Sequence, residues 1–220
     1  MKSIVLFGAS GHAKVIIDVV ERCGDYRIVG LVDSGKIRGE TWFGYEILGG
    51  ESELRKLADR YGFEGGIVAI GDNWIRSLVV DRVLNQLPEF SFVSAIHPGV
   101  CLGRGVQVGR GSVVMAGVTI NSDTRIGDFC IINTSASIDH DNEVEDYASI
   151  GPGAVTGGGV HVGRFSAVSI GASVIHSRTI GPHAVIGAGA TVIDDIPGNS
   201  VAWGTPARVV RSRKPGDPYL

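Results

Sequence analysis

The chain is poor in cysteine and lacks a long apolar run. It has three cysteines among 220 residues. Cys23, Cys101 and Cys130 are too far apart for a zinc motif, and such a sparse, odd set is typical of reduced thiols. No apolar run reaches the roughly 18 residues of a membrane span, and the run Met1–Phe7 is too short for a signal peptide. We therefore expect a cytoplasmic protein with no membrane span and no metal site.

An excess of charge of one sign is lacking as well. The chain carries 20 basic and 23 acidic residues, a net charge of −3. This balance excludes a broadly basic nucleic-acid binder, so we expect no nucleic-acid partner. Hydrophobic residues make up 44% and charged residues 20%, which excludes a disordered chain. The length is that of one large domain or two small ones.

Glycine is the residue in excess, at 33 of 220, about twice its usual share. The glycines do not recur at every third position, which excludes collagen. From Ile96 to Val192 every sixth residue is a branched aliphatic one, except Thr156, and a small residue usually stands four positions later. This register predicts a parallel β-helix with three faces, in which the aliphatic side chains fill the interior and three hexads make one coil.

Two segments break the pattern, Ile138–Glu143 and Thr156–Gly159. With three hexads to a coil, Gly158 stacks on His140, so a bare backbone lies beside an imidazole that carboxylates flank. Such an imidazole can take a proton near neutral pH, Asp141 can orient it, and the Gly158 N–H can stabilise an oxyanion. The residues alone leave two other interpretations open: a solvated histidine in a polar loop, and a passive spacer.

The other histidines of the repeat give weaker signals. His97 lies at the start of the repeat beside Pro98, and we expect it to cap the first coil of the β-helix. His161 and His183 take outward positions, where we expect them to be solvated. His176 stacks two coils from His140, which makes it a candidate for lining the same channel.

The first 95 residues predict a β-α-β unit with strands at Met1–Phe7, Ile28–Val32 and Gly66–Ile70 and a helix at Ala13–Cys23. A glycine turn that leads into a helix can hold a phosphate. The carboxyl ends of parallel strands meet at one edge, so residues 10–12, 33–34 and 71–73 should converge. A dinucleotide site is disfavoured, because Ala13 stands where the third glycine is often found and the domain is short. A turn without a ligand remains open.

The segment Asp139–Asp141, taken together with Ile131–Thr134 and the closing Gly204–Ala207, resembles the PglD/NeuD-type hexapeptide-repeat sugar acetyltransferases. The resemblance covers nearly the whole chain and includes the domain order. It implies a small Rossmann-like nucleotide-sugar-binding domain at 1–95. It also implies a left-handed parallel β-helix acetyltransferase domain with a C-terminal cap at 96–220.

The resemblance also implies roles. In that family a histidine is the general base and the acidic residue after it assists, which corresponds to His140 and Asp141, with the Gly158 amide facing the acetyl carbonyl. The positions that would contact the nucleotide-linked sugar are Ser10, Gly11, His12, Asp33, Ser34, Asn73 and Asn133. Those that would contact acetyl-CoA are Ser149, Ile170 and Ala188. From the charge of the C-terminal tail, and not from the resemblance, we also expect Arg208 to meet the phosphates of CoA. Some members have a second histidine where Ser149 stands here, and a hydroxyl cannot titrate in its place.

We therefore expect an acetyl-CoA-dependent N-acetyltransferase that acts on an amine of a nucleotide-activated amino sugar. The amine would attack the thioester directly, with acetyl-CoA as co-substrate. The family implies a homotrimer whose sites lie between subunits. The sequence leaves open O-acetylation of a sialic-acid-like sugar and a non-catalytic scaffold that binds a nucleotide sugar or CoA. It does not identify the nucleotide base.

Overall fold

The computed structural model describes residues 1–219, so Leu220, the last residue of the expected second domain, lies outside the described part. The chain divides into two compact units, Met1–Pro98 and Gly99–Leu220. No helix within residues 1–219 has both the length and the apolar character that crossing a membrane requires.

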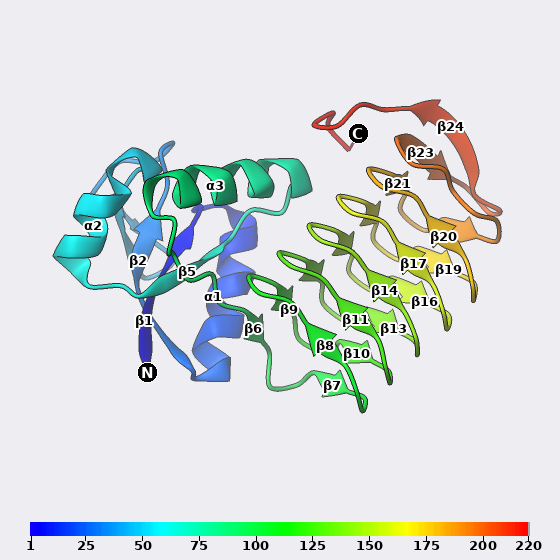
Figure 1. The fold of residues 1–220 in the computed structure, drawn as a ribbon, viewed down its shortest axis with the longest axis horizontal. Helices are drawn as coiled ribbons and strands as arrows, with labels where there is room; N and C mark the ends of the chain where they lie inside the picture. Colours follow the sequence, from blue (N-terminus) through cyan, green and yellow to red (C-terminus); the bar gives the residue numbers. More distant parts are fainter. Residues whose placement is uncertain (220) are drawn as a thin grey trace. The chain divides into compact units, whose positions relative to one another are not determined.

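Unit 1 contains a five-stranded sheet in the order β3-β4-β2-β1-β5 (Figure 1). β2 and β5 flank β1 in parallel, β4 runs parallel to β2, and only the short β3 is antiparallel. The predicted β-α-β unit is present, with the third strand ending two residues earlier than predicted. The segment Phe90–Val93 is not a regular strand, and Phe92 makes a single bridge to Gly66. The strands are β1 (Lys2–Phe7), β2 (Tyr26–Val32), β3 (Thr41–Trp42), β4 (Tyr45–Gly49) and β5 (Gly65–Val68).

The helices of unit 1 are α1 (Gly11–Cys23), the 3-10 turn η1 (Glu51–Glu53), α2 (Leu54–Tyr61) and α3 (Asn73–Gln86). α1 begins directly after the glycine turn and ends at Gly24, whose left-handed φ of 74° suits a glycine C-cap. The carboxylate of Asp72 caps α3 by accepting a hydrogen bond from the Ile75 N–H. α1 and α3 therefore start at the carboxyl ends of β1 and β5.

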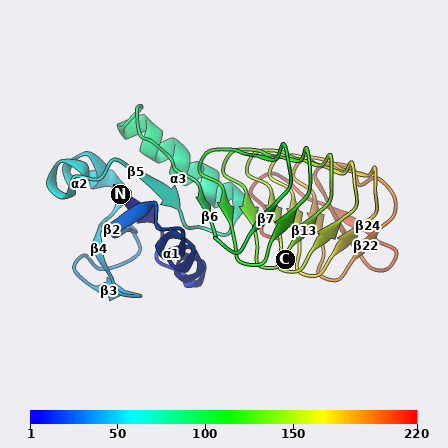
Figure 2. The same ribbon diagram turned by 90° about the horizontal axis from the view of Figure 1, so that it is seen from below.

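Unit 2 is a parallel β-helix whose coils follow one another along its axis (Figures 1 and 2). Short strands recur at every sixth position, and each pairs with its equivalent in the next coil, as Ile120 pairs with Ile138 and Ile138 with Thr156. The three sheets run β22-β19-β16-β13-β10-β7, β20-β17-β14-β11-β8 and β24-β23-β21-β18-β15-β12-β9-β6. The first strand of these sheets, β6 (Ala95–Ile96), precedes the boundary at Pro98. The strands of unit 2 are β7 (Cys101–Leu102), β8 (Gln107–Val108), β9 (Val113–Val114), β10 (Thr119–Ile120), β11 (Arg125–Ile126), β12 (Ile131–Ile132), β13 (Ser137–Ile138), β14 (Glu143–Val144), β15 (Ser149–Ile150), β16 (Val155–Thr156), β17 (His161–Val162), β18 (Ala167–Val168), β19 (Ser173–Val174), β20 (Thr179–Ile180), β21 (Val185–Ile186), β22 (Thr191–Val192), β23 (Ser200–Trp203) and β24 (Arg208–Ser212).

The sixth-residue column fills the interior, as predicted: Ile120, Ile138 and Ile150 are fully buried, and Thr156 is 2% exposed. Every sixth residue from Gly105 to Gly189 has a positive φ, so each corner of the prism uses one left-handed residue. Asp141 is one of them, with φ of 56°. The repeat thus determines the backbone conformation at the predicted catalytic corner.

One row of corners forms an aromatic stack. The rings of Phe129, Tyr147, Phe165 and His183 follow one another with centroids 5.0, 5.0 and 4.8 Å apart. The expectation that His183 is solvated is therefore wrong, because its ring packs on Phe165 and is half-buried. Burial, followed by the charges of Arg213 and Arg164, lowers the pKa of His183.

The C-terminal segment caps the solenoid. β24 pairs antiparallel with β23, which extends one of the three sheets. Val201 of β23 packs with Ala167 and Val185, and Tyr219 covers this cluster. The family resemblance implied a C-terminal cap, but not this hairpin.

Candidate active site

His140 and Asp141 lie at the corner between β13 and β14, and Gly158 lies one coil further at the corner between β16 and β17. A methyl carbon at Gly158 would lie 2.5 Å from Cε1 and 2.6 Å from Nε2 of His140. The imidazole therefore packs directly on the glycine backbone. This is the stacking that coils of three hexads predict.

A hydrogen bond to the His140 ring determines which of its two nitrogens carries the proton. Nδ1 lies 2.7 Å from Oδ2 of Asp141. Because a carboxylate can only accept, the proton of the neutral ring lies on Nδ1, and Nε2 keeps its lone pair. Nε2 is the nitrogen that faces Gly158. The corner therefore presents a proton acceptor beside a bare stretch of backbone.

The surrounding charges adjust the pKa of this imidazole. The hydrogen bond to Asp141, followed by the charge of Asp139, raises the pKa of His140 above its usual value. The hydrogen bond from Asn121, followed by the one from the His140 N–H, lowers the pKa of Asp139. The His140 side chain is 60% exposed, so an incoming molecule can reach it. The arrangement favours a stronger base than free histidine.

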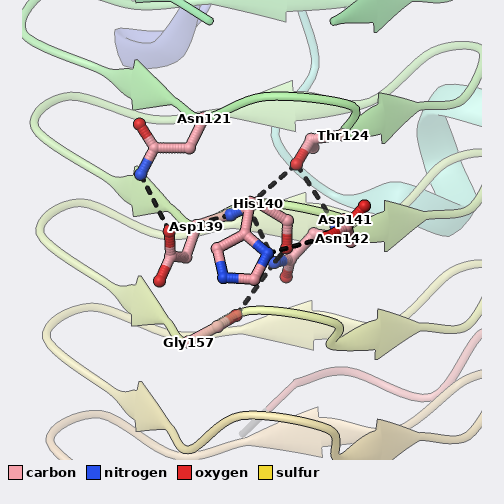
Figure 3. Close-up of polar contacts among 7 residues, drawn as sticks. All are labelled: Asn121, Thr124, Asp139, His140, Asp141, Asn142 and Gly157. Atoms are coloured by element: carbon pink, nitrogen blue, oxygen red, sulfur yellow. Dashed lines mark hydrogen bonds and ion pairs between the residues drawn. The ribbon is translucent and has the colours of Figure 1, made fainter. Parts of the chain in front are cut away.

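Asn142 holds the loop from within (Figure 3). It is 1% exposed, and its Nδ2 lies 2.9, 3.1 and 2.8 Å from the carbonyl oxygens of Asp139, His140 and Gly157. Thr124 adds a bond from its hydroxyl to the Asp139 carbonyl. The amide of Asn142 thus joins the loop that carries His140 to the loop that carries Gly158. Asn142 lies in the segment Ile138–Glu143 that breaks the hexad pattern, but the sequence did not predict this connection.

A hollow of about 560 Å³ lies at this corner, lined by residues 139–141, 157–159 and 176–177. His176 belongs to its wall, in agreement with its predicted position. The Gly158 N–H donates to no other group within residues 1–219, whereas the Gly158 carbonyl accepts from Ser177. An N–H donor without a partner is thus available next to the imidazole.

The residues expected to contact acetyl-CoA do not gather around His140 within one chain. Ile170 and Ala188 lie at the opposite corner of the sheet that contains β13, between β18 and β19 and between β21 and β22. Both are exposed, Ile170 by 57%. Asn133 precedes the same sheet between β12 and β13, and its side chain accepts from the Thr134 N–H. Ser149 lies on β15, next to Ile131 and Ala167.

Arg208 lies at the start of β24. Its Nη1 is 3.1 Å from Oδ2 of Asp194, and its side chain is 60% exposed. Asp194 lies three coils after His140 on the same row of corners. Arg208 therefore presents an exposed cation on the side of the solenoid that carries His140.

In unit 1 the predicted turns meet at the carboxyl edge of the sheet. Ser10 and Gly11, at the start of α1, are exposed. Both oxygens of Asp33 accept main-chain hydrogen bonds, from Ala9 at 2.7 Å and from Gly35 at 2.8 Å. The hydroxyl of Ser34 donates to Glu51. Asp33 thus ties the turn after β1 to the turn after β2.

The turn after β5 is held from inside. Asn73 is 1% exposed, and its oxygen accepts a 2.6 Å bond from Arg76, which is also 1% exposed and bonds to the carbonyls of Ile70 and Gly71. The structure therefore gives Asn73 a buried structural contact. His12 lies against Gly71, and burial followed by the charge of Arg76 lowers the pKa of His12 to about 4.

No group of three or more His, Cys, Asp or Glu side chains suited to a metal occurs in the described part of the chain.

Comparisons with known proteins identify a family model and solved structures that are similar to this chain. A family model described as the PglD N-terminal domain matches residues 3–83. GDP-perosamine N-acetyl transferase from Caulobacter crescentus, in a histidine variant with CoA and GDP-perosamine, shares 36% identity over 96% of this chain and 98% of its own, with a TM-score of 0.90. The acetyltransferase domain of PglB from Neisseria gonorrhoeae FA1090, in complex with acetyl coenzyme A, shares 28% sequence identity over 95% of this chain and 99% of its own, with a TM-score of 0.85.

This chain belongs to the PglD/NeuD-type hexapeptide-repeat sugar acetyltransferases. The predicted fold class, a Rossmann-like domain followed by a hexapeptide-repeat β-helix, is confirmed by these structures. UDP-N-acetylbacillosamine N-acetyltransferase of Bacillus subtilis (strain 168) is 36% identical over 120 residues, 53% of this chain and 52% of that protein. The match therefore spans about half the length of that curated relative. Membership of the family makes the chain an acyltransferase.

Proposed function

We propose that this protein transfers the acetyl group of acetyl-CoA to the amino group of a nucleotide-linked amino sugar. The observation that carries the proposal is the corner at His140. Its Nδ1 is bonded to Asp141, its Nε2 is available, and a glycine with an available N–H lies against the ring. Relatives that act on nucleotide amino sugars support the choice of acceptor.

The chemistry uses these three groups in a direct transfer from acetyl-CoA to the amine, without an acetylated enzyme. The amine nitrogen attacks the thioester carbonyl, and His140 Nε2 takes a proton from the amine as the C–N bond forms. Asp141 holds the ring and stabilises the imidazolium that results. The Gly158 N–H donates to the oxyanion of the tetrahedral intermediate. The C–S bond then breaks, and the imidazolium returns its proton to the departing thiolate.

The residues proposed to bind the nucleotide sugar lie mainly in unit 1, and those proposed to bind acetyl-CoA lie in unit 2. The exposed turn at Ser10 and Gly11, backed by His12, Asp33 and Ser34, would hold the nucleotide sugar through main-chain amides at a helix N-terminus. Asn73 would act there through the turn that it stabilises. Ser149, Ile170 and Ala188 would contact the pantetheine arm of acetyl-CoA, Arg208 would meet its phosphates, and Asn133 would line the acceptor pocket.

We propose a homotrimer in which each site uses two chains. His140 and Gly158 occupy one corner of the prism, whereas Ile170, Ala188 and Asn133 occupy another corner of the same sheet. A second copy that docks its second corner against the first corner of its neighbour would complete the site. Three such contacts close a ring with threefold symmetry.

We propose a cytoplasmic location for the same enzyme. None of the cysteines, which all lie within residues 1–219, is in a disulfide, and Cys130 is buried. This pattern is typical of a reducing compartment.

Release of CoA thiol tests the function. The purified protein is mixed with acetyl-CoA and a panel of GDP-, UDP- and dTDP-4-amino sugars. We expect thiol release with at least one nucleotide class, with the acetylated amine confirmed by mass spectrometry. Transfer only to hydroxyl acceptors such as a sialic acid would refute amine acetylation. Binding of acetyl-CoA without transfer to any acceptor would favour a scaffold.

A further inference from the structure

A second hollow, of about 540 Å³, lies entirely within unit 1, and it shares Asp33 and Ser34 with the proposed nucleotide-sugar site. Its walls are Asp33–Gly35 after β2, Glu51 and Ser52 after β4, and Arg82 and Gln86 on α3. Both loops follow strands that run parallel, so the hollow lies at the carboxyl edge of the sheet. This is the edge that carries the glycine turn after β1.

The strand order indicates which part of a nucleotide would reach this hollow. β1 lies between β5 and β2, and β4 lies on the far side of β2. In parallel sheets of this kind the phosphates bind at the turn after the first strand and the ribose near the end of the second. A nucleotide that extends from the β1 turn across β2 therefore brings its base to the hollow between β2 and β4.

The hollow carries an acceptor and a donor side by side. The Glu51 side chain is only 12% exposed, and one of its oxygens accepts from the Ser34 hydroxyl. The other oxygen lies 3.7 Å from Nη2 of Arg82, beyond hydrogen-bond distance, so both groups keep bonding capacity. The Gln86 amide bonds to the Glu51 carbonyl at 2.7 Å and fixes this residue.

We propose that this hollow binds guanine and selects a GDP-linked sugar, with Glu51 and Arg82 as the specificity-determining residues. Guanine presents two adjacent donors, N1–H and N2–H, which match the two oxygens of a carboxylate, and its O6 and N7 accept from a guanidinium. Uracil and thymine present one N–H between two carbonyl oxygens, which a carboxylate repels. The inference rests on the proposed function for its orientation of the nucleotide.

Calorimetric titration of the unmodified protein with GDP and with UDP tests the selectivity without any variant. A bidentate match of this kind predicts that GDP binds roughly tenfold to a hundredfold more tightly. Equal affinity, tighter binding of UDP, or binding of neither nucleotide would overturn the inference.

The variant Glu51→Gln assigns the selectivity to this side chain. An amide replaces one acceptor by a donor, so affinity for GDP falls while that for UDP is unchanged or rises. Glu53→Gln is the matched control, because Glu53 lies on the same short turn but pairs with Arg38 outside the hollow. Unchanged GDP preference in Glu51→Gln, with a melting temperature equal to that of the control, would overturn the assignment.

The thiol-release assay separates the two proposals. Equal transfer to GDP- and UDP-4-amino sugars would overturn guanine selection and leave the acetyltransferase proposal intact. Selective binding of GDP without any transfer would support the base site and contradict the proposed function.

Discussion

Replacement of Gly158 by alanine is predicted to displace the imidazole of His140. The added methyl carbon would lie 2.5 Å from Cε1 and 2.6 Å from Nε2, whereas ordinary contacts are 3.4–4 Å. The ring therefore has to move by about 1 Å. Within one chain it can do so, because the His140 side chain is 60% exposed.

The magnitude follows from that shift. A misplacement of about 1 Å in a catalytic group costs on the order of 100-fold in rate. That factor corresponds to about 2.7 kcal/mol in the activation free energy. The free energy of unfolding should change by only about 1 kcal/mol, because the substitution disturbs one exposed hydrogen bond, between His140 and Asp141.

The assay is kcat for acetyl transfer, measured together with thermal melting. Gly62→Ala is the control: Gly62 ends α2 with φ of 65° and has open space around it. There we expect a loss of stability of about 1–2 kcal/mol with kcat unchanged. If Gly158→Ala keeps the rate of the unmodified protein, the imidazole does not act from its place on the glycine, and the account of the corner is wrong.

Three further predictions concern single groups. Asp141→Asn removes the main cause that raises the pKa of His140. Because the base acts when it is neutral, the acidic limb of the pH profile of kcat/KM should move to lower pH while the plateau falls. An acidic limb at the same pH as in the unmodified protein would contradict this prediction. Thr156→Val replaces a buried hydroxyl that has no hydrogen-bond partner within residues 1–219. The free energy of unfolding measured in urea should therefore be unchanged or rise by up to about 1 kcal/mol. A clear fall in the free energy of unfolding would refute this prediction. His12, whose pKa burial lowers to about 4, should stay neutral from pH 5 to 8 in an NMR titration. The native state should lose stability as the pH falls from 6.5 toward 4, because the unfolded chain binds the proton in this range and the folded chain does not. An NMR titration midpoint of His12 near pH 6.5 would contradict the burial of the ring.

The repeat made unit 2 and its corner predictable from the sequence. A fixed step of one coil places Gly158 on His140, and the same step places Asn121 next to Asp139, where it bonds at 2.9 Å. Periodicity suffices here because every coil adds the same rise and rotation. The aromatic stack that ends at His183 has the same spacing and was missed, since aromatic rings at left-handed corners were not expected.

Unit 1 was less predictable because its turns have no repeat. The glycine turn, the helix after it and the convergence at the sheet edge follow from local signals. The burial of Asn73 against Arg76 does not, because it depends on how α3 closes over the end of β5. Glu51 gave no signal, since a lone glutamate after a strand is usually solvated, and only the folded loops bring it to Ser34 and Arg82.

The most direct test of the central claim is the rate of acetyl transfer by His140→Asn, in protein shown by calorimetry to bind acetyl-CoA as the unmodified protein does. The side chain is exposed, so the substitution should leave the fold intact. Loss of the general base predicts a fall in kcat of about 10² to 10⁴ with little change in KM. A kcat within about fivefold of the unmodified protein would contradict the assignment of His140 as the base.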